Sequence, residues 1–316
     1  MSKKPKKSCK FTSIGGMAVM EGIMMRGPTK TSLGVRLPSG ELYVEECRYT
    51  SPREKYRVLR LPLIRGVMAF VESMLNGYKV LMRSAELAAT EEERTEEQKE
   101  KDNKLFAVLS VIATILGFGL AFFLFFFCPT YIFNWIDGIT AADLSAFRGL
   151  FEGIMKFALF LLYIVLVSMM KEIKRVFMFH GAEHKTIFCY EANEPLTVEN
   201  CRKFSRFHPR CGTSFMVFMI LISILLSSCL VWIVPGIAKL PVLWVAVKIL
   251  MLPLFCGIGF EIIRYCGKHD NTFTRVVSMP GKWVQRITTR EPEDGMLEVA
   301  IAALTDVIPE NGEDRM

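Results

Sequence analysis

Apolar residues in this 316-residue chain are gathered into long blocks instead of recurring at the short periods typical of a soluble core. Four blocks, at 105–127, 154–170, 214–234 and 241–260, approach or exceed the roughly 20 residues that a helix needs to cross a bilayer. The block at 154–170 is the weakest of the four. Glu152 and Lys156 stand at its start, one helical turn apart, where they can pair, and a helix buried in protein or lying at the interface is the alternative there. We predict four transmembrane helices.

The Lys and Arg residues between these blocks predict an orientation. Residues 1–104 hold 20 of them, 128–153 hold one, 171–213 hold eight, 235–240 hold one, and the stretch from 261 onward holds seven. Cytoplasmic loops carry the excess of basic residues in membrane proteins. The alternation therefore predicts an even number of spans in a plasma membrane, with both termini in the cytoplasm.

The segments outside the blocks show shorter periods. Residues 31–46 alternate around Pro38-Ser39-Gly40, which predicts a β-hairpin. Apolar residues at helical spacing between 64 and 88 predict an amphipathic helix that lies on the inner leaflet or packs on a cytoplasmic domain. The face consists of Ile64, Val67, Met68, Val71, Met74, Leu75, Tyr78 and Leu81.

The C-terminal segment predicts a docked helix. Pro280-Gly281 opens its first part, and Thr289 is expected to cap a helix that buries Met296, Val299, Ala300, Ala303 and Leu304. The chain then divides into a mixed α/β cytoplasmic region (1–88), a charged linker (89–104), a first transmembrane pair (105–170), a cytoplasmic His/Cys loop (171–213), a second transmembrane pair (214–260) and a cytoplasmic helical tail (261–316).

Composition narrows the class of protein further. Hydrophobic residues make up 51% of the chain, its mean hydropathy is +0.31, and charged residues make up 22%. This balance excludes an ordinary soluble enzyme and indicates a membrane protein with substantial parts outside the bilayer. The net charge of +7 comes with no nucleic-acid-binding motif, so we expect no nucleic-acid partner. Nine irregularly spaced cysteines argue against a disulfide framework.

Three of the four histidines lie in the loop at 171–213. His180 and His184 frame Glu183 in an H-x-x-E-H order, and helical positions four apart share a face, so both imidazoles can reach one ion. This order is the inverse of the zincin motif and characterises the inverzincin zinc hydrolases. His208 or Cys211 can supply a third ligand, which leaves one tetrahedral zinc position for water. Glu183 is then the expected general base.

Other readings of these residues stay open. The two histidines of the motif can instead cap a helix and hydrogen-bond locally, with Arg210 and Cys211 merely preceding the next span. Glu191, two helical turns past His184, is a further candidate ligand. Lys248 inside a predicted span is a functional candidate, although outward snorkelling explains it as well. Two more candidates follow the last span: Glu261 with Arg264, expected to pair or to form a polar wall near the histidines, and His269 with Asp270, a further candidate ligand.

Four segments resemble a known family. Residues 15–28 (GGMAVMEGIMMRGP), 180–191, 196–215 and 280–304 are similar to the YqhQ-like bacterial membrane proteins, known as domain of unknown function 1385. That family has been described as predicted metal-dependent enzymes. The resemblance therefore implies a metal site, in agreement with the ligands expected in the His/Cys loop. Its first motif usually reads GGQAVIEGVMMRG, so Met17 departs from the pattern here. Glu21 and Arg26 are retained and are candidates for lining the same site.

Three functions follow from these observations. The first is a hydrolase that uses a divalent metal, zinc by preference, at the cytoplasmic membrane face, with a membrane-associated peptide or a lipid-linked molecule as substrate. The second is a non-catalytic scaffold or assembly factor whose histidine loop docks a partner. The third is a transporter, which with four spans would require an oligomer; the oligomeric state is open.

Overall fold

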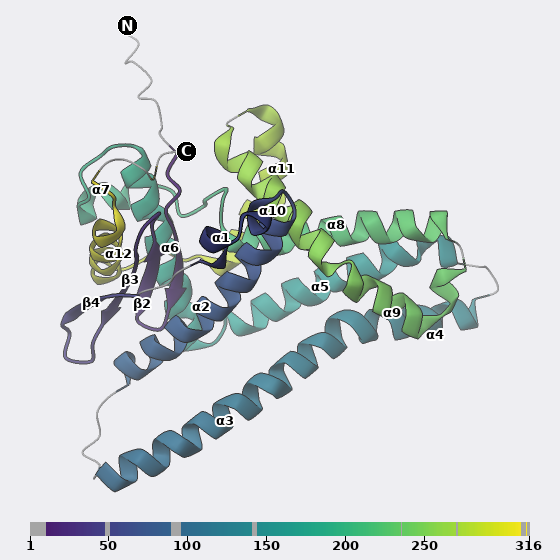
Figure 1. The fold of residues 1–316 in the computed structure, drawn as a ribbon, viewed down its shortest axis with the longest axis horizontal. Coiled ribbons are helices and arrows are strands. Elements are labelled where there is room, and N and C mark those ends of the chain that lie inside the picture. Colours follow the sequence, from purple (N-terminus) through teal and green to yellow (C-terminus); the bar gives the residue numbers. More distant parts are fainter. Residues whose placement is uncertain are drawn as a thin grey trace, which may run out of the picture. The chain divides into compact units, whose positions relative to one another are not determined.

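The computed structural model describes residues 11–47, 51–89, 96–140, 144–234, 236–269, 271–310 and 314. The chain is mostly helical and carries one antiparallel sheet near its N-terminus (Figure 1). It divides into two compact units. The first unit consists of Met1–Ala89, Ile164–Phe218 and Cys256–Met316, and the second of Thr90–Tyr163 and Met219–Phe255.

The sheet belongs to the first unit and has four strands in chain order. The hairpin predicted at 31–46 is confirmed, because β3 and β4 pair with Arg36 opposite Leu42. A second hairpin, formed by β1 and β2 around the two-residue turn Met20-Glu21, was not predicted. Glu21 has a φ of 49°, a conformation that such turns usually fill with Asn or Gly, so the usual turn signal is missing. The strands are β1 (Gly15–Val19), β2 (Gly22–Arg26), β3 (Thr31–Arg36) and β4 (Leu42–Glu46).

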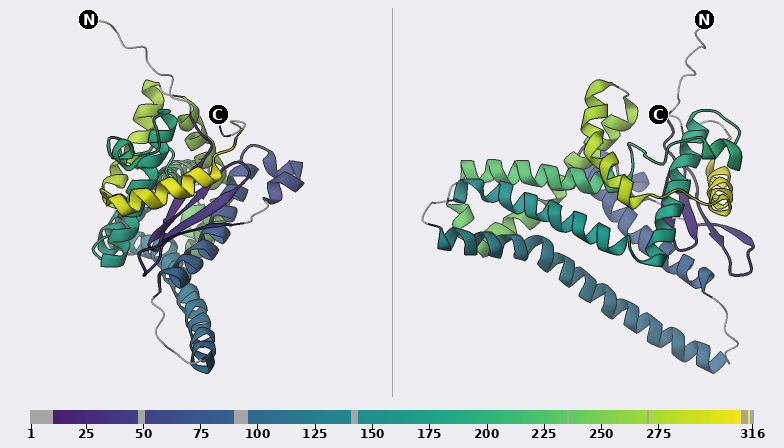
Figure 2. Two further views of the ribbon diagram at one scale, coloured as in Figure 1. Left: turned by 90° about the vertical axis from the view of Figure 1, so that its left-hand side faces the viewer. Right: turned by 180° about the vertical axis from the view of Figure 1, so that it is seen from behind.

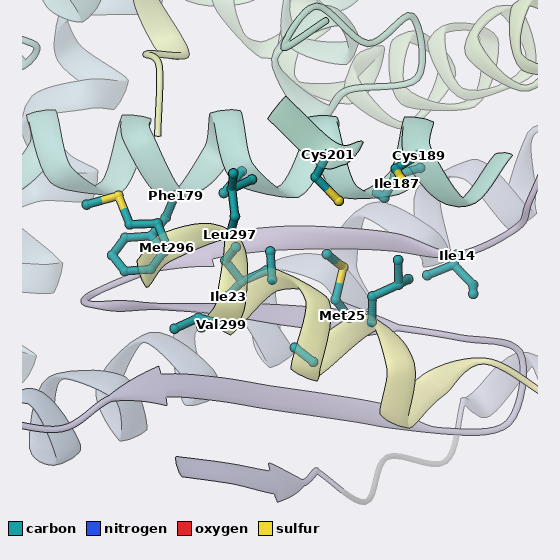
Figure 3. Packing of buried hydrophobic residues seen from close by; sticks show 14 of the residues in the cluster. Ile14, Ile23, Met25, Phe179, Ile187, Cys189, Cys201, Met296, Leu297 and Val299 are labelled. Atoms are coloured by element: carbon teal, nitrogen blue, oxygen red, sulfur yellow. The ribbon is translucent and has the colours of Figure 1, made fainter. Parts of the chain in front are cut away.

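Two layers of helix cover the sheet. On one face, α12 (Asp294–Val307) lies across β2 and β3 and also packs on α6 (Lys171–Glu191) (Figure 2). Figure 3 shows Ile23 and Met25 of β2 meeting side chains from these two helices in a continuous apolar core. The predicted face of the C-terminal helix is buried here: Met296, Val299, Ala300, Ala303 and Leu304.

The opposite face of the sheet is covered by α2 (Ile64–Ala88), which confirms the predicted helix. Its contact side is not the apolar stripe, however. Val80 packs on Val19, Leu33 and Val35, while the predicted stripe is largely exposed, as at Leu75 with 62% of its surface accessible. Small residues are buried along the same helix. Gly77 lies against Met17 of β1, and Gly66 lies against Gly257 and Phe260.

The region before α12 differs from the prediction. Helix α11 (Thr272–Thr288) begins eight residues before Pro280, which lies inside it. Asn271 caps α11 through a capping box, so Pro280 does not open the element. Thr289 ends α11 and donates its hydroxyl to the carbonyl of Gln285, and Glu293 occupies the N-cap of α12. The predicted cap at Thr289 is therefore wrong.

Among the described residues, three helices are long and apolar enough to cross a membrane, and a bent helix pair makes a fourth if its two halves form one span. The first stretch, Val111–Ile139, extends beyond the predicted block because a π-helical turn (Phe123–Phe127) joins α3 to α4. The fourth bends by 42° between α9 and α10. Pro253 stands at the start of α10, where its ring and missing N–H interrupt the helical ladder. The elements are α3 (Glu96–Phe122), α4 (Cys128–Ile139), α5 (Arg148–Val167), α8 (Gly212–Ile233), α9 (Pro241–Leu250) and α10 (Leu252–Lys268).

The second unit buries a cluster of charged residues, which we call the Glu152 cluster: Glu152, Arg148, Lys248, Thr130 and Trp244. Both Arg148 and Lys248 form ion pairs with the Glu152 carboxylate. The expected pairing of Glu152 with Lys156 is replaced by these two, and the Lys156 amine lies 5.5 Å from the centre of the Phe126 ring. Lys248 is 2% exposed, so it does not snorkel outward.

Short elements complete the chain. Helix α1 (Pro52–Lys55) and a 3₁₀ turn (Arg57–Arg60) precede α2, and α7 (Val198–Arg202) follows α6. Two further 3₁₀ turns are Ser145–Phe147 and Ile237–Lys239.

Candidate metal centre

Helix α6 brings the three residues of the H-x-x-E-H motif together. His180 and His184 are one turn apart, and the centres of their rings are 4.4 Å apart. Glu183 lies beside them and is buried, as is His184. The helical spacing of the motif thus places two imidazoles and one carboxylate on the same side of α6.

A thiol reaches this face from the segment that leads into α8. The Cys211 Sγ lies 3.1 Å from the His180 Nε2. One ligand atom from each of His180, His184 and Cys211 lies within 4.8 Å of the other two. We call these three residues the His/Cys centre. Its three donors come from two segments that are far apart in the sequence but fold into one unit.

Backbone carbonyls orient both imidazoles. The Nδ1 of His180 lies 2.8 Å from the carbonyl oxygen of Thr288, and the Nδ1 of His184 lies 2.5 Å from that of Arg206. A carbonyl only accepts, so each Nδ1 carries the hydrogen, and each Nε2 is the ring nitrogen left to bind a ligand. This second layer of hydrogen bonds is characteristic of metal-binding histidines.

Two glycines leave the space that this arrangement requires. A Cβ on Gly181 would lie 2.0 Å from the Arg290 carbonyl oxygen, so the glycine lets the segment that follows α11 pass close to α6. A Cβ on Gly16 would lie 2.9 Å from the Glu183 carboxyl carbon. Instead, the Gly16 N–H of β1 donates to the Glu183 Oε1 at 3.1 Å. The glycine-rich motif thus contacts the histidine helix through its backbone.

Burial and charge set the protonation of these groups. Burial raises the pKa of Glu183, and the neighbouring imidazoles only partly offset it. Burial alone would raise the pKa of the Cys211 thiol, but the charges of His180 and His184 and their hydrogen bonds hold it well below its usual range. Although burial disfavours its charged form, the Cys211 thiolate raises the pKa of His180 to about 9. A thiolate in contact with imidazole is the form of cysteine that binds metal.

His208 lies next to the centre but outside the ligand group. Its ring centre is 5.5 Å from that of His184. Its Nε2 faces the Glu191 carboxylate at 3.7 Å, and its Nδ1 accepts from the Arg210 N–H at 3.3 Å. Burial, the Arg210 charge and His184 lower the pKa of His208 to about 4 despite the Glu191 carboxylate. The structure therefore assigns His208 a neighbouring position.

Glu191 and Arg210 form an ion pair that ties the N-terminal segment to this region. The Arg210 guanidinium donates to Glu191 and also, at 2.6 Å, to the Thr12 carbonyl. Glu191 in turn accepts the Thr12 N–H at 2.9 Å. Burial alone would raise the pKa of Glu191, but His208 and Arg210 have the larger combined effect, so the pKa is lowered. Its carboxylate is thus occupied by protein donors and does not point to the His/Cys centre as a ligand.

The other predicted polar residues lie elsewhere. Glu21 pairs with Arg175, and Arg26 lies 3.6 Å from Glu72, at opposite ends of the β1–β2 hairpin, so the expectation that they line the site is wrong. Arg65 holds the Glu261 carboxylate in place of the expected Arg264. Exposed His269 stacks on Tyr265 and is not a ligand in the cluster. Asp270 lies outside the described residues.

A cavity of about 580 Å³ opens onto the centre. His180, Glu183, His184 and Cys211 line it together with most of β1. Phe260, Ile263 and Arg264 of α10 form another part of its wall, so Arg264 does face the cavity as predicted for a polar wall. The candidate ligands are therefore accessible from a space large enough for a small ligand or part of a larger one.

Sequence reasoning missed several groups around the centre. Gln285 of α11 is fully buried; it accepts the His208 N–H at 2.7 Å and donates to the His208 carbonyl at 2.7 Å. The only available signal was a polar residue on the buried face of an amphipathic helix. The carbonyls of Thr288 and Arg206 leave no trace in side-chain patterns.

The donor set fits a divalent metal. Two imidazole nitrogens and one thiolate are ligands that zinc prefers, and a set of three leaves one position open. The Nδ1–H groups are already engaged by carbonyls, and the Glu183 carboxylate is close by without being a member of the ligand group. The residues present therefore form a cluster that could hold a metal ion.

Comparison with known proteins gives a family but no function. The profile of a family described as "Protein of unknown function (DUF1385)" matches residues 61–310. The chain is also 34% identical over 302 residues to "Uncharacterized protein YqhQ" from Bacillus subtilis (strain 168), which covers 93% of this chain and 92% of that protein. No solved structure gives a significant match. The resemblance found in the motifs is confirmed.

Proposed function

The chain belongs to the family of unknown function DUF1385, and from this premise we propose that it is a metal-dependent hydrolase of the membrane surface. The observation that carries the proposal is the convergence of three ligand atoms, from His180, His184 and Cys211, within 4.8 Å of one another beside a buried carboxylate and a cavity. A structural zinc site would instead use four protein ligands and no cavity.

The residues of the centre divide the work as follows. His180, His184 and Cys211 would hold the metal, which lowers the pKa of a bound water and polarises a substrate carbonyl. Glu183 is the residue placed to take a proton from the attacking water, and burial would favour its protonated form afterwards. The Gly16 N–H fixes one of its oxygens, so the second oxygen is the one available for proton transfer.

The position at a membrane follows from the candidate spans and from the first unit. Three separate stretches of chain make up that unit: the N-terminal region, the His/Cys loop and the C-terminal region. These are the stretches that carry the excess of Lys and Arg. Their assembly into one unit supports an even number of spans, with the centre and both termini on the cytoplasmic side of the plasma membrane.

Cobalt substitution tests the proposed chemistry without a known substrate. Detergent-purified protein is loaded with Co²⁺ and its absorption spectrum is recorded before and after addition of azide. A catalytic centre with a thiolate ligand is expected to give a charge-transfer band that is absent in Cys211→Ala and visible bands that shift when azide enters the open position. A spectrum that does not respond to azide would indicate a closed structural site and would contradict the proposal.

Glu183→Gln separates catalysis from metal binding. We expect this variant to bind Co²⁺ with the wild-type spectrum, because Glu183 is not in the ligand group. Hydrolysis is measured on membranes of cells that express either protein, by labelling newly formed amine termini and by extracting lipids. Products that appear with wild type and also with Glu183→Gln at equal rates would show that Glu183 is not the base.

A further inference from the structure

Strand β1 is an edge strand, and some of the peptide groups on its outer side have no partner strand. It is the outermost strand of the sheet, and Val19 and Gly22 close its two-residue turn. In such a hairpin the closing pair is hydrogen-bonded, so alternate residues point their peptide groups away from β2. Gly16 and Ala18 are these residues. The Gly16 N–H donates to Glu183 and not to β2, which agrees with the assignment.

The cavity runs along this edge. Four consecutive residues, Gly15 to Ala18, line it together with the His/Cys centre and Glu183. A Cβ on Gly15 would meet nothing within 4 Å, and Ala18 is only partly buried. Small residues therefore leave the β1 main chain accessible at Gly15 and Ala18, whereas Gly16 is packed against Glu183. Five residues of strand span about 17 Å.

Apolar side chains form much of the remaining wall of the cavity, and Arg210 and Arg264 are its charged members. Ile14, Val176 and Phe177 contribute from the first unit's core segments, and Phe260 and Ile263 contribute from α10. Helix α10 is part of the bent candidate span. An occupant that uses both the edge and the walls needs an extended main chain and apolar side chains.

We infer that the substrate is an extended, apolar stretch of polypeptide that adds as a strand to the outer edge of β1, with its scissile peptide bond beside Glu183. This inference rests on the proposed function and names its substrate class. Strand addition is a common mode of peptide recognition, in which main-chain hydrogen bonds supply affinity and side-chain pockets supply selectivity. Ala18 can offer both its N–H and its carbonyl, and Gly16 its carbonyl.

The reaction balances without a further reactant. Water adds its oxygen to the peptide carbonyl carbon, the carbon–nitrogen bond breaks, and the proton taken by Glu183 passes to the leaving nitrogen. The second proton of the water ends on the same nitrogen, so the products are a carboxylate and an ammonium group. Glu183 accepts a hydrogen bond from Gly16 of β1. The proton transfer would therefore take place next to the main chain of the bound strand.

A scan of N-methylated peptides tests the inference independently of catalysis. Glu183→Gln protein without added metal is titrated with fluorescent nine-residue peptides of Leu, Val and Ala, each methylated at one amide nitrogen. Strand addition uses every second amide, so affinity is expected to fall about 2- to 10-fold at alternate positions only. A flat profile, or no binding of any peptide, would overturn the inference.

A matched pair of proline variants tests the edge itself. Ala18→Pro removes one outward N–H from β1, which an edge strand tolerates. Val44→Pro removes an equivalent outward N–H from β4, at the opposite edge of the sheet. We expect Ala18→Pro to weaken peptide binding about 2- to 10-fold and Val44→Pro to bind as wild type does. Equal binding by both variants would contradict the inference, and the methylation scan stands if Ala18→Pro fails to fold.

The two proposals fail in different ways. Peptides that bind with the period-two pattern to a protein whose centre takes up no Co²⁺ would sink the hydrolase and leave the β1 edge as a peptide-binding site. An azide-responsive centre combined with no peptide binding, and with products only in the lipid extract, would leave the hydrolase standing and overturn the polypeptide as its substrate.

Discussion

The chain buries two clusters of ionisable side chains, and they differ in what their polar atoms face. In the Glu152 cluster, the carboxylate accepts hydrogen bonds from Thr130, Arg148, Trp244 and Lys248. In the His/Cys centre, hydrogen bonds fix the outer side of each imidazole, while the Nε2 atoms and the thiolate converge beside a cavity. Burial of charge is common to both clusters. Only the second offers lone pairs to a ligand.

This difference changes the weight of the three functions considered from the sequence. Lys248 within a predicted span was a functional candidate from the sequence, and its amine is bound to Glu152 inside the cluster. Breaking a buried ion pair of this kind is strongly destabilising, so we interpret the pair as part of the packing between helices and not as a transport site. In the histidine loop, in contrast, the candidate ligand atoms of His180 and Cys211 contact each other, and no salt bridge to a carboxylate holds the three ligand residues within the part of the chain that the structure describes.

The largest expected effect is on the Glu152 cluster. Glu152→Gln leaves the charges of Arg148 and Lys248 buried without their carboxylate, and removing one partner of a buried pair typically costs about 3–5 kcal/mol. We expect a large drop in the midpoint of thermal unfolding in detergent, with metal content per folded chain unchanged. The double variant Glu152→Leu with Lys248→Met should recover part of the loss. A Glu152→Gln protein that keeps wild-type stability but loses its metal would contradict the separation of the two clusters, because Glu152 would then support metal binding.

The Glu72 carboxylate gives a second test of the comparison. Protein donors occupy its oxygens, so we expect it to contribute to stability and not to metal binding. Glu72 on α2 lies in the same unit as the centre and accepts from Ser51 and Arg53. Its burial raises its pKa, but these donors and Arg26 outweigh it, so the pKa is lowered in the folded protein. Its stabilisation is therefore present above the unfolded-state pKa of about 4.3 and is lost as the pH falls through the lower folded-state pKa.

Glu72→Gln should accordingly be destabilised at pH 7, by about 1.5–3 kcal/mol, and should approach wild-type stability at acidic pH. Urea unfolding at a series of pH values measures this directly. A difference that grows as the pH falls would contradict the assigned direction of the pKa shift. Metal content should be unaffected throughout.

The sharpest division within the first unit is between His184 and His208. The former belongs to the ligand group, whereas the latter lies behind it with Glu191 and Arg210. We expect His208→Ala to weaken metal binding by about 10- to 100-fold, as is typical of groups that support ligands, and to retain metal at saturating concentration. Competition with a metal-binding dye measures the affinity. Complete loss of binding would return His208 to the ligand set.

Much of this arrangement could be predicted from the sequence, for physical reasons. The apolar blocks, the hairpin around Pro38-Ser39-Gly40 and the helical spacing of His180 and His184 are local patterns, and each leads to its element without knowledge of the fold. The choice of Cys211 over His208 was not local. It depends on how the segment before α8 lies against α6, which is set by Gln285 from α11 and by the close approach at Gly181.

Other features of the structure could not be predicted because the local sequence pattern does not indicate them. The β1–β2 hairpin turns at Met20-Glu21 without the usual turn residues, and its motif was interpreted only through its glycines. The pairing of Glu152 with Lys248 joins residues 96 positions apart, whereas the sequence offered Lys156 one turn away. On α2, the apolar stripe predicted the helix but not its contact side, because the small residues Gly66 and Gly77 pack more closely.

Elemental analysis of the gently purified protein tests the central claim most directly. Wild type, His184→Ala, Glu183→Gln and His269→Ala are measured side by side; the last removes an exposed histidine that stacks on Tyr265. We predict about one zinc or other divalent transition metal per chain in wild type, Glu183→Gln and His269→Ala, and close to none in His184→Ala. No bound metal in wild type, even after reconstitution with zinc, or equal metal in His184→Ala, would contradict the account.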